Sequence, residues 1–286
     1  MDAGDRGPQM DRWRLTTTSN SAEWTGRGQG VATDATSWFV TQNDRDPGVS
    51  RYSSDFRVLE ARADIPRSTA GHVGAVSVFD GTIYVALEGP ERIISFDRDL
   101  TKRSLVTVER PVERDDRPHL AWCAINPANG LIYTCDWNHA PELTAYDPVT
   151  GNSVPSADIP LATTTHRVQG AVFSPGGRVY LASDEKLTRG EQIREWLGPL
   201  GGRTHRTIYP GIHGFDAETG NKLGYVRVPT RPHFPHFEEI EGLGLGTMTV
   251  DGAETHVHLA VLDKNHSWLR DEVHIKSFAA PSPELL

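Results

Sequence analysis

Short apolar stretches, each bounded by residues that favour turns, recur along the whole chain. The clearest unit lies at residues 119–151, with the sequence HLAWCAINPANGLIYTCDWNHAPELTAYDPVTG. It reads as an apolar strand, a turn at Asn126–Gly130, a second strand at Leu131–Cys135 and a third strand that closes on Tyr146–Gly151. Short strands separated by Gly, Pro, Asn and Asp predict an all-β fold built of hairpins.

The same unit occurs five times along the chain. Each copy begins with a small residue in an apolar strand, turns tightly, and continues into a strand rich in aromatic or β-branched residues. These small residues are Gly30, Gly74, Ala121, Gly170 and Gly242. Intervals of about 45–50 residues separate the first four, which is the period of a four-stranded propeller blade. The pattern predicts a single β-propeller domain at residues 1–286, with five four-stranded blades.

The last repeat supplies only three strands, at Leu243–Val250, His256–Leu262 and Val273–Phe278. Residues 13–18, with the sequence WRLTTT, have the β-branched character of a strand, and residues 1–11 before them are expected to be flexible. We expect residues 13–18 to complete the last blade, because that pairing would remove an exposed sheet edge and lock the ring.

Two segments depart from the repeat. Within the insertion at Asp184–His213, the stretch Thr188–Leu197 predicts a short helix in the fourth blade, because Thr188 can cap it and Glu191 follows three residues later. The segment Pro229–Glu241, PTRPHFPHFEEIE, is rich in proline and is expected to be irregular. Long connections of this kind in a compact domain are often functional.

The third strands end in a recurring turn sequence. Tyr146-Asp147 and Phe215-Asp216 are each followed by two residues and then Thr-Gly, and the preceding strands contain Ile-Tyr-Val at Ile83–Val85. These features resemble the β-propeller repeats of the YncE, NHL and quinoprotein-like superfamily over residues 25–280. The resemblance implies the fold and carries no activity.

Charge and hydropathy limit the classes of molecule with which this protein could associate. The net charge is −9 and the pI is about 5.7, which argues against a nucleic-acid partner because phosphate binding requires a basic face. No apolar run approaches the roughly 18 residues that span a membrane. The first residues, MDAGDRGPQMDRWRL, lack the apolar core of a secretory signal, so we expect a cytoplasmic protein, with a secreted mature form as the alternative. The expected partner is a small molecule or saccharide, and the oligomeric state stays open.

The chain has two cysteines, Cys123 and Cys135. They lie on strands joined by one hairpin and are therefore close enough for a disulfide. Two buried thiols are the favoured prediction, and a disulfide is the alternative.

Polar residues at defined strand ends locate a candidate site. In a propeller, the start of each innermost strand and the end of the second strand lie on the same face, where all blades converge. The residues at these positions are Gln29, His72, His119, His166, Gln169 and Glu241 at the starts, and Asn43, Glu88, Asp136, Asp184 and Asp263 at the ends. Acidic residues at strand ends also form local turns, which is the simpler interpretation of each one singly.

These residue types suggest acid–base or metal chemistry. We expect the catalytic residues among His72, His119, His166, Asp136 and Glu241. No cofactor is specified, and the residues expected to bind a zinc or calcium ion, if one is present, are His72, His119, His166 and Glu88. The expected substrate-binding residues are Gln29, Asn43, Trp137, Asp184, Gln169 and Asp263.

Two classes of function follow. Because the polar residues differ from repeat to repeat, the sequence favours one composite site over one site per blade. The first hypothesis is an enzyme of the hydrolase or lyase type that acts on a small molecule or saccharide. The alternative is a propeller that binds a ligand or a protein without catalysis, as a lectin or scaffold does.

Overall fold

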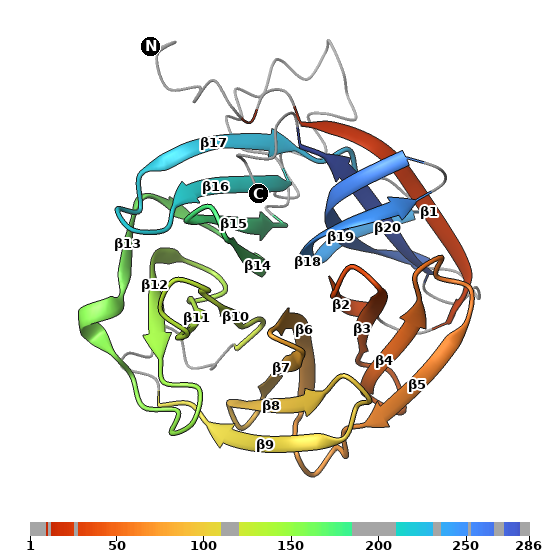
Figure 1. Cartoon of the computed structure of the whole chain (residues 1–286), viewed down its shortest axis with the longest axis horizontal. Helices are drawn as coiled ribbons and strands as arrows, with labels where there is room; N and C mark the ends of the chain where they lie inside the picture. Colours follow the sequence, from red (N-terminus) through yellow and green to blue (C-terminus); the bar gives the residue numbers. More distant parts are fainter. Residues whose placement is uncertain are drawn as a thin grey trace, which may run out of the picture.

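The strands form five antiparallel sheets of four strands each, arranged as blades around a central axis (Figure 1). The structure is a computed structural model that describes residues 10, 13–25, 28–109, 120–184, 210–230, 236–250, 253–265 and 272–280. Within these ranges the chain is a five-bladed β-propeller, as the repeats predict. The innermost strands β2, β6, β10, β14 and β18 surround the axis in Figure 1.

The first three blades follow the chain from the inside outwards. Their strands are β2 (Gly28–Thr33), β3 (Ser37–Gln42), β4 (Gly48–Ser53) and β5 (Leu59–Asp64); β6 (His72–Phe79), β7 (Thr82–Glu88), β8 (Arg92–Asp97) and β9 (Lys102–Thr107); and β10 (Ala124–Ile125), β11 (Ile132–Thr134), β12 (Ala140–Tyr146) and β13 (Ile159–Thr165). A short 3-10 helix at Pro155–Ala157 precedes β13.

The last two blades differ from one another in their connections. The fourth comprises β14 (Val168–Ser174), β15 (Arg178–Ser183), β16 (Gly211–Asp216) and β17 (Lys222–Arg227). The fifth comprises β18 (His236–Val250), β19 (Ala253–Asn265) and β20 (Glu272–Ala279), with β1 (Arg14–Thr25) as its outermost strand. The expected helix at Thr188–Leu197 lies outside the described residues and stays a prediction. No helix in the described part of the chain is long and apolar enough to cross a membrane.

The ring is closed by pairing between the two ends of the described chain. β1 runs antiparallel to β20, with Arg14 opposite Ala279 and Asn20 opposite His274. The strand extends to Thr25 and is therefore longer than the closing segment expected at residues 13–18. The segment expected to be irregular before the last blade is partly a strand, because β18 begins at His236, directly after its last proline. Proline lacks the N–H that a sheet requires, so pairing starts where the prolines end.

The innermost strands approach one another backbone to backbone. A Cβ added to Gly242 would lie 2.5 Å from the Cα of Gly30, and one added to Gly30 would lie 2.7 Å from the Cα of Ala75. Between the second and third blades, the Ala75 N–H donates to the Ala121 carbonyl at 2.8 Å. The small residues of the repeat therefore allow five blades to meet around a narrow axis.

The Asp-x-x-Thr-Gly sequences form turns between the third and fourth strands. Asp147 Oδ1 accepts hydrogen bonds from the N–H of Thr150 at 2.7 Å and of Val149 at 2.9 Å. These bonds favour the ionised carboxylate and hold the pKa of Asp147 below its usual range. Gly151 has a φ of 75° and its carbonyl accepts from the Glu109 N–H, so the turn packs against the segment that follows β9 of the preceding blade. The motif is structural.

Apolar side chains fill the space between neighbouring blades. Between the third and fourth blades, the rings of Tyr133 and Phe173 lie 4.9 Å apart. The two cysteines are buried and unbridged, which confirms the favoured prediction, and burial raises the pKa of Cys123 to about 12. The thiols are therefore packing residues.

A buried histidine joins the fifth blade to the first. His258 packs edge-on against Trp38, with ring centroids 4.5 Å apart. Its Nε2 lies 2.9 Å from the Gly246 carbonyl and its Nδ1 lies 3.0 Å from Ser277 Oγ. Because a carbonyl can only accept, Nε2 carries the proton and the neutral ring satisfies both partners. Burial lowers the pKa of His258 to about 4.

Replacement of Gly242 by alanine tests the close packing at the axis. We expect Gly242→Ala to lower the free energy of unfolding by about 2–3 kcal/mol, because the new methyl group overlaps the Gly30 backbone. Gly81→Ala is the control, since its turn has a φ of 67° but open space around it, and backbone strain alone should cost about 1 kcal/mol. Urea unfolding measures the free energy of unfolding of the two variants. An equal decrease in both would contradict the packing argument.

Acid should destabilise the fold through His258. The folded pKa of about 4 lies below the ordinary value of 6.5, so the unfolded chain binds more protons and stability falls as the pH decreases from above 6.5 through 4. Between about pH 7.5 and about pH 5, this histidine should lower the free energy of unfolding by about 2 kcal/mol.

His258→Gln removes that titration. The variant should be less stable at neutral pH but lose less stability on acidification, as measured by urea unfolding at both pH values. An unchanged acid dependence in His258→Gln would contradict this account.

Candidate functional site

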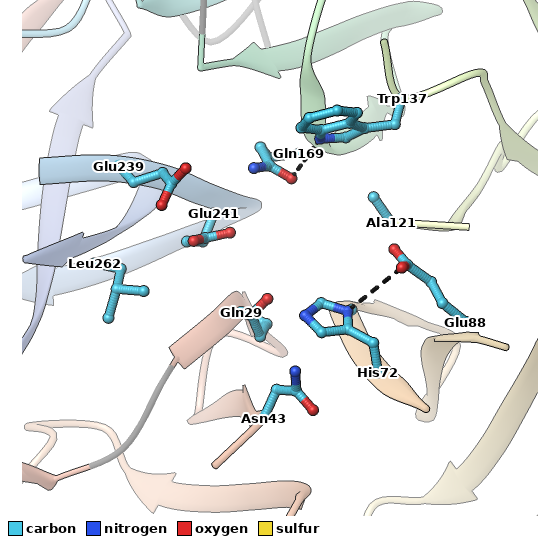
Figure 2. Close-up of a pocket in the computed structure, with 11 residues that line it drawn as sticks. Gln29, Asn43, His72, Glu88, Ala121, Trp137, Gln169, Glu239, Glu241 and Leu262 are labelled. Carbon is cyan, nitrogen blue, oxygen red and sulfur yellow. Dashed lines mark hydrogen bonds and ion pairs between the residues drawn. The ribbon is translucent and has the colours of Figure 1, made fainter. Parts of the chain in front are cut away.

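A cavity of about 280 Å³ lies at the mouth of the central channel (Figure 2). All five blades contribute to its wall, from the starts of the inner strands and the ends of the second strands. The lining residues are Gln29, Asn43, His72, Gly74, Glu88, Ala121, Trp137, Gln169, Glu239, Glu241 and Leu262. Seven of the residues that the sequence analysis selected thus share one cavity: Gln29, Asn43, His72, Glu88, Trp137, Gln169 and Glu241.

Bulges in the inner strands place three of these side chains. The pairing of the inner strand with the second strand shifts between Gly28 and Gly30, between Val168 and Gly170, and between Ile240 and Gly242. The residue in the middle of each shift is Gln29, Gln169 or Glu241. A bulge adds one residue to a strand and can redirect its side chain. The glycine that follows each bulge packs against the backbone of the neighbouring blade. The same short stretch of strand therefore determines both the contact between blades and the direction of the polar side chain.

His72 and Glu88 form a pair on the second blade. They lie directly opposite one another on β6 and β7, and His72 Nδ1 is 3.7 Å from Glu88 Oε2. The imidazole is 38% exposed and the Glu88 side chain 17%, so both reach the cavity from a packed strand pair. The dashed line in Figure 2 marks this contact. The geometry suits a carboxylate that orients an imidazole.

Asn43 fixes the neighbouring wall. Its Oδ1 accepts a hydrogen bond from Arg67 Nη1 at 3.0 Å and from the Val73 N–H at 3.3 Å. These contacts connect the end of β3 to the start of β6, which carries His72. Asn43 therefore helps to position the His72 strand.

Trp137 and Gln169 form the opposite wall. The indole Nε1–H donates to Gln169 Oε1 at 2.9 Å, which fixes the orientation of both side chains. The guanidinium of Arg167 lies over the Trp137 ring, 4.9 Å from its centroid. The aromatic wall of the cavity is thus supported by a cation.

Arg167 also lies near two buried carboxylates. Its Nη2 is 3.8 Å from Asp184 Oδ2 and 3.7 Å from Glu239 Oε1. Asp184 Oδ1 accepts the Ile240 N–H at 3.1 Å, which connects the fourth blade to β18. Asp184 therefore lies behind the cavity wall. Its bond to the Ile240 N–H fixes the strand that carries Glu239.

The other selected residues lie elsewhere. His166 Nδ1 lies 3.0 Å from the Asn138 carbonyl, and His166 does not line the cavity. Asp136 Oδ1 accepts from the N–H groups of Asn138 and His139, so this carboxylate forms a local turn. His119 lies outside the described residues. Only the backbone of Asp263 is described, in β19 opposite Glu238.

Three residues in or beside the cavity wall are not predicted from the sequence: Glu239, Leu262 and Arg167. Glu239 lies in the segment assigned to irregular chain, although its position two residues before Glu241 could have placed it on the same strand. Arg167 directly precedes β14 and has a φ of 52°, a conformation that the repeat does not reveal. Leu262 lies within β19, one residue before the selected Asp263 and directly opposite Glu239.

Of the expected metal ligands that the structure describes, only two line the cavity. His72 and Glu88 line the cavity, but His166 does not. Among the described residues, no three His, Cys, Asp or Glu side chains gather in an arrangement that could hold a metal ion.

The other end of the channel has a different character. A cavity of about 550 Å³ there is lined mainly by apolar residues, among them Phe79, Ile125, Phe173, Leu243 and Leu245. The channel is therefore polar at the end with the candidate site and apolar at the opposite end.

No family model and no curated protein matches this chain. Solved structures with the same fold include glutaminyl cyclase from Myxococcus xanthus, with a TM-score of 0.55, 11% identity, and coverage of 93% of this chain and 97% of that one. A tail fibre of Staphylococcus aureus phage P68 has a TM-score of 0.53 and 11% identity, with 95% of this chain matching 53% of that one. At these identities the similarity establishes the β-propeller fold alone.

Removal of the Arg167 charge tests the buried carboxylate link. We expect Arg167→Met to lower the free energy of unfolding by about 1–2 kcal/mol near neutral pH, because Asp184 and Glu239 lose a neighbouring cation, with a discount for the partial exposure of the arginine. The loss should shrink at acidic pH, where the carboxylates take up protons. Urea unfolding measures this loss, and Arg103→Met, which removes an exposed arginine whose Nη1 donates to Thr82 Oγ1, is the control. A loss that does not depend on pH would contradict the electrostatic explanation.

Proposed function

We propose that this protein is a hydrolase or lyase that acts on a small molecule or saccharide in the polar cavity. The His72–Glu88 pair carries the proposal, because it combines a positioned imidazole with a carboxylate at the wall of a cavity. Propellers host many unrelated functions, so the fold selects no reaction. The proposal depends on the side chains.

The geometry supports a different task for each of the two residues. Glu88 lies beside Nδ1 of His72, which leaves Nε2 for the substrate or for a water molecule. A carboxylate in this position sets the tautomer of the ring and stabilises the imidazolium that forms when Nε2 accepts a proton. The 3.7 Å between Nδ1 and Oε2 is longer than a hydrogen bond, and catalytic contacts often shorten when substrate binds. His72 is the proposed general base, and it returns the proton to the leaving group.

Other wall residues would hold the substrate. Gln29 and Gln169 present amide groups, and Trp137 offers an aromatic surface fixed by its bond to Gln169. A cavity with a few convergent polar groups and an aromatic wall is typical of a small-molecule site. The blades contribute different residues to it, which supports one composite site.

Kinetics of variants test the proposal. A panel of chromogenic esters, amides and glycosides detects hydrolysis, and ultraviolet absorbance of a new double bond detects elimination. We expect His72→Asn to lower kcat at least about 100-fold and Glu88→Gln about tenfold, because general base catalysis contributes that much. Both variants should retain the wild-type unfolding midpoint to within a few degrees.

Glu142→Gln, on the exposed face of β12, is the matched control for Glu88→Gln and should leave kcat unchanged. Full activity of His72→Asn would contradict the role of His72 as the general base. Ligand binding without turnover of any substrate in the panel would instead favour the alternative class, a propeller that binds its ligand without catalysis.

A further inference from the structure

We infer that the apolar cavity at the second end of the channel is a separate binding site, which takes one uncharged aromatic molecule of up to about three rings. In the described part of the chain, the residues that line it are all different from those of the polar cavity. The inference therefore does not depend on the proposed function, and each can fail without the other.

The cavity lies where apolar cores between the blades reach the axis. Phe173 belongs to the core between the third and fourth blades, while Val78 and Leu245 pack against the cores between the first and second blades and between the fourth and fifth. Val78, Phe79 and Leu245 are only half-buried, and all three line the cavity. They therefore present apolar surface to it, and a molecule that covers this surface would remove it from water.

The fifth blade raises the wall on one side. A Cβ added to Gly246 of β18 would lie 2.6 Å from Cγ2 of Thr33, the last residue of β2, so these two residues lie at the same level. β18 continues beyond this level to Val250 before the chain returns in β19. Thr247 and His256 of this long hairpin line the cavity. The hairpin therefore bounds one side of the site.

Polar side chains in the wall have partners within the protein. Thr33 Oγ1 donates to the Ser37 carbonyl at 2.9 Å, and Asp34 Oδ2 accepts from Arg98 Nε at 2.7 Å. Both ring nitrogens of His256 have partners, each at 3.3 Å. These side chains are held by the protein and do not require a ligand to satisfy them.

Three further polar residues complete the wall. The Ser77 oxygen is itself buried, beside the Cys123 thiol, whereas Asp80 and Thr247 are exposed and stay in water. A charged group that entered the cavity would lose its water and find no unpaired opposite charge inside the described wall, which is unfavourable. The wall therefore selects an uncharged ligand.

The volume sets the size of this ligand. The cavity measures about 550 Å³, which lies within the roughly 300–1,000 Å³ of small-molecule sites. An apolar cavity of roughly 150 Å³ in another protein holds one benzene molecule, so this cavity has room for about three aromatic rings. Phe79 and Phe173 supply aromatic surface against which such rings can pack.

Two fluorescent probes with one skeleton test the inference. N-phenyl-1-naphthylamine is uncharged and has three aromatic rings, and 8-anilinonaphthalene-1-sulfonate carries a sulfonate on the same skeleton. We expect the uncharged probe to bind with one-to-one stoichiometry, to emit more brightly and to raise the Tm. The sulfonate should bind at least roughly tenfold more weakly, because its charge would lose water beside the Asp34 and Asp80 carboxylates.

Variants of Leu245 locate the site. Leu245→Gln places an amide in the wall and should weaken binding of the uncharged probe roughly tenfold, whereas Leu245→Met keeps an apolar side chain and should change the affinity by less than about twofold. Leu105→Gln is the matched control, since Leu105 is also half-buried but does not line the cavity. Circular dichroism verifies that each variant is folded.

Val78→Trp tests the volume itself. The larger side chain should occupy part of the cavity and weaken binding of the uncharged probe at least roughly tenfold, even if Leu245→Gln fails to fold. Trp137→Ala should leave the affinity unchanged, because Trp137 lines the other cavity.

Equal affinity of the two probes, binding that neither Leu245→Gln nor Val78→Trp weakens, or no binding of the uncharged probe at its solubility limit would overturn the inference. Loss of binding in Trp137→Ala would place the probe in the polar cavity and would also overturn it. So would a dimer, detected by sedimentation, that Leu245→Gln dissociates while the probe does not bind, because the apolar mouth would then be an interface between two copies.

Discussion

The close contact between innermost strands is the constraint on which the rest of the structure depends. Five blades can surround so narrow an axis only where the residues at the contact lack large side chains, as at Gly30 and Gly242. The strand bulges directly before these glycines, and the bulge residue projects into the channel mouth. The packing of the ring and the polar cavity therefore arise from the same few residues, which leaves little freedom to change one without the other.

The sequence predicts the fold well because each blade repeats its local chemistry. The spacing of the small residues indicates the number of blades, and the Asp-x-x-Thr-Gly turns mark the change from third to fourth strand. The prediction for the Pro-rich segment before β18 was wrong in part. Prolines exclude strand pairing where they stand, but they do not show that pairing begins at the next residue, His236. The insertion in the fourth blade has no counterpart in the other repeats, so the repeat pattern does not predict its structure.

The candidate site could be predicted in part. Strand topology alone placed His72, Glu88 and Glu241 at one mouth of the channel, as the structure does. Topology could not distinguish Glu88 from Asp136, because both lie at the end of a second strand. Glu88 faces the cavity, whereas the Asp136 carboxylate accepts hydrogen bonds within a local turn. Arg167 was missed for a different reason. Its importance lies in contacts with Trp137, Asp184 and Glu239, which come from three different blades.

The pairing of β1 with β20 has a consequence for the order of folding. The first strand of the propeller has its partner at Glu272–Ala279, so the fifth blade cannot be completed until nearly the whole described chain has been synthesised. Until then β1 lacks its partner, while the first four blades need only neighbours close in sequence. Contacts so distant along the chain slow folding and leave strand edges available to other molecules. The edges of β1 and β20 therefore stay open to other molecules until the ring closes.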